Sequence, residues 1–193
     1  MRYIEVEKKE SNRIEQGDIY SNVEYIEMIS QKDEELSINK IIFPYVVVLS
    51  QDCDLKQTSP YFEGEAHSGD DDKKLFSVIV APIYNEGLFL LGEHLADETI
   101  GYQMQKIEKL RKGKETTNYR NLINNETPRY HYLNFKEEVG LPNSIIDFKH
   151  FFTVDIKYLY SIKSTNFVIK IKVLYRESIT QRFSNFLSKI GLP

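Results

Sequence analysis

The chain has 193 residues, of which 41% are hydrophobic and 28% charged, a composition that excludes a disordered or fibrous protein. Its one cysteine, Cys53, excludes an internal disulfide and fits a reducing compartment. The N-terminal residues hold no apolar stretch of the signal-peptide type, and the longest apolar run, residues 41–49, is too short to span a bilayer. We therefore expect a cytoplasmic protein with no membrane segment.

The net charge of −4 conceals an asymmetry along the chain. Residues 1–100 carry 9 Lys and Arg against 21 Asp and Glu, whereas residues 101–193 carry 16 against 8. One interpretation is a single domain with an acidic pole and a basic pole. The other is that the basic half meets an anionic partner, because a local field matters more to binding than the net charge.

The first half of the chain shows strand patterns separated by polar turns. Residues 19–29 read as extended, and residues 30–37 read as a turn. Residues 41–49 and 75–83 are β-branched, continuously apolar runs, which is typical of strands buried on both faces. After a turn, residues 88–91 are expected to extend the sheet.

In the second half, apolar residues at helical spacing predict an amphipathic helix over residues 97–112, closed by Gly113. A loop is expected over residues 115–129. Further strands are predicted at residues 130–135, 144–154 and 167–173, and a helix at residues 177–190.

Six or so short strands with two or three helices indicate an α+β fold built on a small, strongly bent, partly open β-barrel. The chain has no internal repeat and no long Pro-, Gly- or Ser-rich linker. We therefore expect one domain over residues 1–193, with a helical insertion near residues 97–128 and a C-terminal helix near residues 177–190.

Four segments, in order, resemble the PemK/MazF-like toxin barrels. They are the Gly-Asp-hydrophobic opening at residues 17–20, the Pro-x-hydrophobic-Leu-Ser strand at 44–50, the strand with a closing Pro-Ile at 78–83, and the Thr-hydrophobic-Asp-x-x-x-Leu stretch within 144–159. The resemblance implies an SH3-like barrel, usually dimeric. It also implies an ancestral activity, the metal-free cleavage of single-stranded RNA through an arginine and a small hydroxyl residue.

The chain departs from that pattern at the catalytic positions. Phe43 stands where active members place the arginine, Tyr84 where they place Thr or Ser, and His150 where they place Gln. Metal-free RNA cleavage needs a base for the 2′-hydroxyl and a cation or acid for the phosphorane and leaving group, and a phenyl ring supplies neither. The substitutions indicate that the ancestral chemistry is lost or has been rebuilt elsewhere.

A dense polar cluster, with Asp52, Cys53 and Asp54, directly follows a buried strand. Cys53 is a candidate nucleophile, and the two acids are candidate bases or ligands. Against this, neighbouring carboxylates raise a thiol's pKa rather than activate it. The alternative is a capped turn with Cys53 packed inward.

Four histidines are present, and none is spaced for a zinc site, so we expect no metal and no cofactor. His150 is the one candidate catalytic histidine, because it lies on the strand that resembles the active strand of the toxin barrels. The alternative is a packed or surface histidine.

A basic segment also stands out as a candidate nucleic-acid surface, because phosphates need Lys and Arg density and bases stack on aromatic rings such as Tyr119. Its cations are Lys106, Lys109, Arg111, Lys112, Lys114 and Arg120. The alternative is a solvated helix face.

These features lead to three functional hypotheses. The first is a divergent PemK/MazF-like barrel that serves as a non-catalytic interaction module, in a bacterial toxin–antitoxin or phage-defence setting. The second is an active metal-free endoribonuclease with relocated groups, drawn from Asp52, Asp54, His150, Arg120 and Arg129. The third is a nucleic-acid-binding regulator. A protein partner or a homodimer is expected, and RNA is a possible partner.

Overall fold

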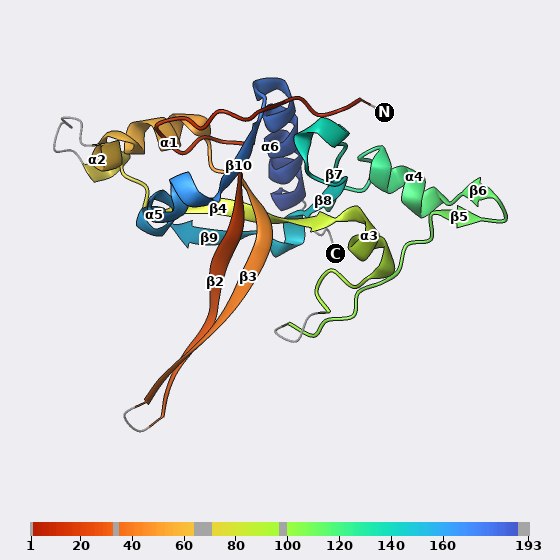
Figure 1. Cartoon of the computed structure of the whole chain (residues 1–193), viewed down its shortest axis with the longest axis horizontal. Helices are drawn as coiled ribbons and strands as arrows, with labels where there is room; N and C mark the ends of the chain where they lie inside the picture. Colours follow the sequence, from red (N-terminus) through yellow and green to blue (C-terminus); the bar gives the residue numbers. More distant parts are fainter. Residues whose placement is uncertain (1, 33–34, 64–70, 97–99, 189–193) are drawn as a thin grey trace.

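The computed structural model describes residues 2–32, 35–63, 71–96 and 100–188 (Figure 1). Its main sheet is antiparallel and strongly curled into an open half-barrel, with the strand order β1-β10-β2-β3-β4-β8-β7 and with β9 also paired to β4. The strands of this sheet are β1 (Val6–Glu7), β2 (Asp18–Lys32), β3 (Glu35–Val48), β4 (Ser77–Asn85), β7 (Tyr130–Leu133), β8 (Ser144–Asp147), β9 (Phe152–Asp155) and β10 (Phe167–Ile171).

The helices are α1 (Asp52–Thr58), α2 (Pro60–Glu63), α3 (Glu86–Leu91), α4 (Thr117–Ile123), α5 (Ile156–Asn166) and α6 (Val173–Leu187), with short 3-10 turns at η1 (Asp71–Lys73), η2 (Glu137–Val139) and η3 (Phe148–His150). The expected α+β class and the bent, partly open barrel are confirmed. Helices are more numerous than the two or three expected. None of those in the described ranges is long and apolar enough to cross a membrane.

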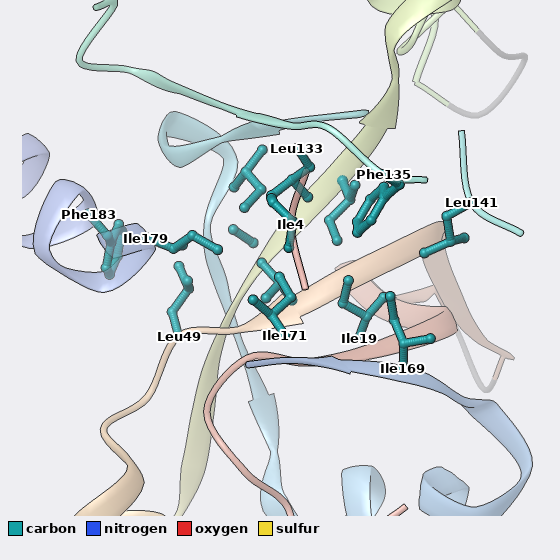
Figure 2. Close-up of a cluster of buried hydrophobic side chains, with 14 of the residues drawn as sticks. Ile4, Ile19, Leu49, Leu133, Phe135, Leu141, Ile169, Ile171, Ile179 and Phe183 are labelled. Atoms are coloured by element: carbon teal, nitrogen blue, oxygen red, sulfur yellow. The ribbon is translucent and has the colours of Figure 1, made fainter. Parts of the chain in front are cut away.

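Residues 46–49 and 78–83, in the middle of the sheet, are largely buried on both faces, as their apolar sequence predicted, whereas Ile42 and Phe76 of the predicted runs are exposed. Side chains alternate along a strand, so Val47 and Val46 of β3 enter different cores. The first core lies under α6, where Ile179 and Phe183 pack beside Leu49 (Figure 2). The second core is covered by α1 and α5, which contribute Leu55, Ile156 and Leu159.

The two long strands β2 and β3 form a ribbon that projects from the body (Figure 1). The two strands stay paired as far as Lys32 and Glu35. The predicted turn over residues 30–37 is therefore too long, because both strands continue through polar residues that side-chain patterning alone does not mark as extended. Residues 33–34 lie outside the described ranges.

The predicted strand over residues 144–154 is interrupted, and this interruption shapes the candidate site. β8 pairs with Ile83–Asn85 of β4, and β9 pairs with residues 77–80 of the same strand. Pro82 lies between these two pairings. The N–H and C=O groups of Ile79 both point to the β3 edge of β4, and these directions alternate along a strand. Three residues later, the backbone of Pro82 therefore faces the opposite edge, where β8 and β9 pair. Proline offers no N–H there, so pairing stops and the chain turns out as η3, which carries His150.

Two other sequence predictions are wrong. Residues 88–91 belong to helix α3 rather than a strand, because the Asn85 side chain caps the helix start by accepting from the N–H groups of Gly87 and Leu88.

No helix occupies residues 100–112. Leu110–Arg111 (β5) and Lys114–Glu115 (β6) instead form a hairpin over Lys112 and Gly113, whose φ angles of 52° and 75° suit a two-residue turn. Residues 97–99 lie outside the described ranges.

Helix α4 forms within the predicted loop over residues 115–129, where the Thr116 hydroxyl accepts from the Tyr119 N–H. Helix α5 was missed, although Asp155 caps it and Leu159 is fully buried four residues later. The C-terminal helix is confirmed but starts earlier, at Val173. Its predicted end, at residue 190, lies outside the described residues.

Candidate functional site

The interruption between β8 and β9 brings His150 into contact with three other polar side chains. Its Nδ1 lies 3.0 Å from the Tyr84 hydroxyl and 3.3 Å from Asp147 Oδ2. Its Nε2 lies 3.4 Å from Arg129 Nη2. Since a guanidinium only donates, Nε2 is the accepting nitrogen of His150 and Nδ1 carries the proton.

Arg129 is held in one orientation from two sides. Asp147, which is fully buried, accepts from Arg129 Nε at 2.8 Å and from Nη2 at 2.6 Å. The guanidinium also lies over the Tyr130 ring, 5.0 Å from its centroid. This leaves Nη1 without a hydrogen bond among the described residues, so it can donate to a ligand.

The electrostatics of the cluster keep its histidine neutral. Burial lowers the pKa of His150, and the charges of Arg129 and Lys149 lower it further against the opposing charge of Asp147. Burial, with the Asp147 charge, raises the pKa of Tyr84 far above its usual value, so this hydroxyl stays protonated. At neutral pH His150 can accept a proton at Nε2, whereas the Tyr84 hydroxyl keeps its own proton and cannot act as a base.

Two cavities flank this cluster. One, of about 260 Å³, is lined by Arg129, His94 and Tyr130 with residues from α4. The other, of about 240 Å³, is mostly apolar and contains His150 and Tyr84 in its wall. Its remaining lining is largely aromatic: Tyr25, Phe43, Tyr102, Phe151 and Phe152. Phe43, Tyr84 and His150, the three positions at which the chain departs from the toxin pattern, therefore line one pocket.

A second histidine lies close to the cluster. The His94 ring stacks on the Phe89 ring, with 4.5 Å between the ring centroids. It also contacts the Tyr84 ring at a tilt, with 4.6 Å between the centroids. Burial lowers the pKa of His94 to about 4, so its ring is neutral at physiological pH. Both of its nitrogens are buried without a hydrogen-bond partner in the described structure.

The six basic candidates lie on the β5–β6 hairpin and around α4, and all are exposed. Lys109 is engaged by Glu86 at 3.0 Å and lies over the Tyr119 ring. The other five, Lys106, Arg111, Lys112, Lys114 and Arg120, make no side-chain hydrogen bond or ion pair with the residues that the structure describes. Three of the six line a groove of about 510 Å³, and Asn118 lines both this groove and the cavity of Arg129.

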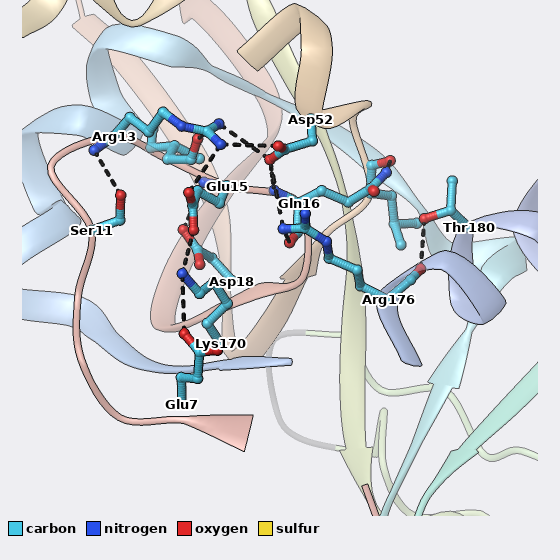
Figure 3. Close-up of polar contacts among 12 residues, drawn as sticks. Glu7, Ser11, Arg13, Glu15, Gln16, Asp18, Asp52, Lys170, Arg176 and Thr180 are labelled. Carbon is cyan, nitrogen blue, oxygen red and sulfur yellow. Dashed lines mark hydrogen bonds and ion pairs between the residues drawn. The ribbon is translucent and has the colours of Figure 1, made fainter. Parts of the chain in front are cut away.

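Asp52 belongs to a different cluster (Figure 3). Arg13 donates to both of its oxygens, at 3.1 and 2.9 Å, and Arg176 lies 3.7 Å away. Burial alone would raise the pKa of Asp52, but Arg13 and Arg176 hold it below its usual value. Both oxygens are thus occupied, and the residue ties α1 to the N-terminal segment and to α6.

Cys53 is exposed in the first turn of α1, so the expectation that it packs inward is wrong. Its Sγ lies 3.4 Å from Asp54 Oδ1 and 3.5 Å from Gln51 Oε1. The structure therefore places Asp52, Cys53 and Asp54 on one helix start. None of the three shares a contact with His150, and a common site for these four candidates has no support in the geometry.

Sequence reasoning missed the role of Asp147. The available signal was a lone acid inside an apolar run, between Ile146 and Phe148, since a buried carboxylate requires a partner. Among the described residues, no group of three or more His, Cys, Asp and Glu side chains is arranged to hold a metal ion.

The fold and the cluster together define an α+β half-barrel protein with an arginine, a neutral histidine and a tyrosine at the break in its sheet. In comparisons with known proteins, no family model and no curated protein sequence matches this chain. The PemK/MazF-like resemblance stays a prediction.

Proposed function

We propose that this protein binds single-stranded RNA and cleaves its phosphodiester backbone without a metal, using Arg129 and His150. The observation that carries the proposal is the 3.4 Å approach of Arg129 Nη2 to His150 Nε2 beside the Tyr84 hydroxyl. The resemblance implies an arginine at the position that Phe43 occupies. Arg129, which directly precedes β7, supplies a cation beside His150 instead.

In the proposed reaction, His150 Nε2 takes the proton of a ribose 2′-hydroxyl, whose oxygen attacks the adjacent phosphorus. Arg129 binds the non-bridging oxygens, where negative charge develops in the transition state. The bond to the 5′-oxygen breaks, that oxygen takes up a proton from water, and a 2′,3′-cyclic phosphate remains. A neutral histidine suits this base, because only the unprotonated imidazole accepts the proton.

The surroundings support the choice of a single-stranded substrate. A base can stack in the aromatic pocket next to His150, since any base has a π-face. The basic hairpin can contact phosphates further along the strand, and its groove adjoins the Arg129 cavity at Asn118.

The test is the incubation of a mixed RNA pool with the wild-type protein, with His150→Gln and with the control Lys157→Ala, each with and without EDTA. We expect cleavage with cyclic-phosphate ends by the wild type and by Lys157→Ala in both conditions, and a loss of ~100-fold or more in His150→Gln. Lys157 is an exposed residue of α5 and makes no side-chain contact in the cluster. Absence of cleavage by the wild type, or unchanged cleavage by His150→Gln, contradicts the proposal.

A second candidate is the non-catalytic interaction module. It is favoured by the projecting β2–β3 ribbon, which carries exposed Ile26, Ile29, Leu36 and Ile38. In that case a protein partner or a second copy binds the chain, and RNA is retained by the wild type without being cut. The toxin–antitoxin or phage-defence setting rests on the resemblance alone.

A further inference from the structure

The β2–β3 ribbon extends far beyond the cores of the half-barrel (Figure 1). β2 pairs with β10 only near Ile19, and β3 pairs with β4 only at Val46–Val48, so no strand flanks the outer ribbon among the described residues. From the Tyr25–Ile41 pair to the Lys32–Glu35 pair the ribbon runs about 20 Å. An isolated two-stranded ribbon is marginally stable in water, so this one needs a covering surface.

The strand register collects the apolar residues of the ribbon on one face. Directly paired residues share a face, and Ile29 pairs with Ile38 while Ile26 pairs with Lys40. The register shift between Ile26 and Met28 keeps both isoleucines on the face that β3 fills with its even-numbered residues. This ribbon face comprises Glu24, Ile26, Ile29, Gln31, Leu36, Ile38, Lys40 and Ile42.

The ribbon face is large enough for a protein interface. Its five aliphatic side chains are 50–63% exposed. Together they present roughly 500 Å² per copy, so two such faces bury about 1,000 Å², the lower limit of a specific interface. The opposite face of the outer ribbon is more polar, with Ser30 paired to Ser37 and Met28 to Asn39.

The charge of the ribbon face fits an identical face. Its two charged residues, Glu24 and Lys40, already pair with each other at 2.7 Å. A second copy therefore meets a mainly apolar surface of no net charge, whereas a nucleic acid would find only Lys40, which is already paired with Glu24.

We propose that two copies of this chain dimerise by packing their ribbon faces against each other. The proposal does not depend on RNA cleavage. It accounts for an exposed aliphatic surface that is held on a ribbon too slender to be stable alone.

The matched test uses two double variants of equal net charge. Ile29→Glu with Ile38→Lys places a cross-strand ion pair in the ribbon face, and Ser30→Glu with Ser37→Lys places the same pair on the opposite face. By sedimentation equilibrium we expect the wild type and the serine variant at twice 22.7 kDa, and the isoleucine variant to dissociate ~100-fold more readily or to be monomeric. Circular dichroism checks that both variants fold.

A second measurement covers the case in which the isoleucine variant fails to fold. In a Cys53→Ser background, Ile38→Cys should form a disulfide-linked dimer on oxidation, and Ser37→Cys should not. A wild-type monomer at all concentrations overturns the proposal and leaves the ribbon face to another protein. A dimer that survives the isoleucine variant, or equal cross-linking at residues 37 and 38, also overturns it.

Discussion

Arg129 and Asp147 form a two-point ion pair across the edge of the half-barrel, with Nε to Oδ1 at 2.8 Å and Nη2 to Oδ2 at 2.6 Å. The Asp147 side chain is fully buried and the Arg129 side chain is 28% exposed. Asp147 also accepts from the Lys149 N–H and so fixes the turn that leads to His150. The same carboxylate therefore orients both the cation and the imidazole of the candidate site.

Asp147→Asn should destabilise the protein, because it leaves the buried side of Arg129 without its counter-charge. We expect a loss of about 2–4 kcal/mol in the free energy of unfolding, measured by urea denaturation at pH 7. Glu138→Gln, on an exposed side chain, serves as the control and should change the unfolding midpoint little. Equal midpoints for the two variants would show that the ion pair carries no stability.

Asp18 should make the protein less stable as the pH rises. Burial raises the pKa of this carboxyl from 3.8 to about 7, so between these values the folded protein holds a proton that the unfolded chain has lost. The stabilisation is complete below about pH 4 and disappears as the pH passes 7. His94 and His131, with lowered pKa values, act in the opposite direction at acidic pH.

The difference between wild type and Asp18→Asn isolates this contribution, because the histidines are common to both. The unfolding free energy of the wild type relative to the variant should fall by ~1.4 kcal/mol per pH unit between pH 4 and 7. A difference that stays constant over this range would mean that Asp18 has an ordinary pKa in the folded state.

The Asp52→Asn variant should show that Asp52 stabilises the fold and takes no part in RNA cleavage. The substitution removes the charge that Arg13 binds at two points, and we expect a loss of about 1–2 kcal/mol in stability. RNA cleavage at a temperature well below unfolding should remain near the wild-type rate. A folded Asp52→Asn protein with abolished cleavage would instead place Asp52 in the active site.

The basic hairpin should bind phosphates by counterion release. Each lost phosphate contact lowers the slope of log affinity against log salt by roughly 0.7 for a single strand, so Arg111→Gln with Lys114→Gln should lower it by roughly 1.4. Binding is measured by fluorescence anisotropy with His150→Gln, which prevents cleavage. The exposed Lys157, on α5, provides the control; if Lys157→Gln has the same effect, the contribution is not specific to the hairpin.

The pH profile of cleavage should report a neutral histidine as the base. Because the pKa of His150 lies below its usual 6.5, kcat/KM should be flat near neutral pH and should fall about tenfold per pH unit only in the more acidic range. Asp147→Asn removes the charge that favours the protonated ring, so it should shift this fall to lower pH. A profile that declines already from pH 8 downwards would point to a different base.

The sequence alone predicted much of the framework. Apolar runs at residues 41–49 and 75–83 indicated strands buried on both faces, and residues 46–49 and 78–83 are largely so buried, whereas Ile42 and Phe76 are exposed. The alternation in residues 167–173 predicted β10. The sequence-based prediction failed where a local contact competes with the hydrophobic pattern. Asn85 caps a helix where a strand was predicted, and Lys112 with Gly113 closes a hairpin where a helix was predicted.

The candidate site was partly visible in the sequence. His150 was singled out by its place on the strand that resembles the active strand of the toxin barrels, the six basic residues by their density, and Asp52 by its place in a polar cluster after a buried strand. In the fold Asp52 pairs with Arg13, 39 positions away, and His150 meets Tyr84, 66 positions away. Such pairings depend on strand register and on where Pro82 interrupts it, and neither is encoded by nearby residues.

Composition, burial pattern and the bent α+β architecture thus followed from the sequence, since side-chain periodicity reports directly which faces of an element meet water. The partner of each charged group was decided by the tertiary structure, because burial forces Asp147 to find Arg129 and the half-barrel determines which arginine lies within reach. The ribbon face, too, exists only through the register shift between Ile26 and Met28, which brings two isoleucines of β2 to the same side.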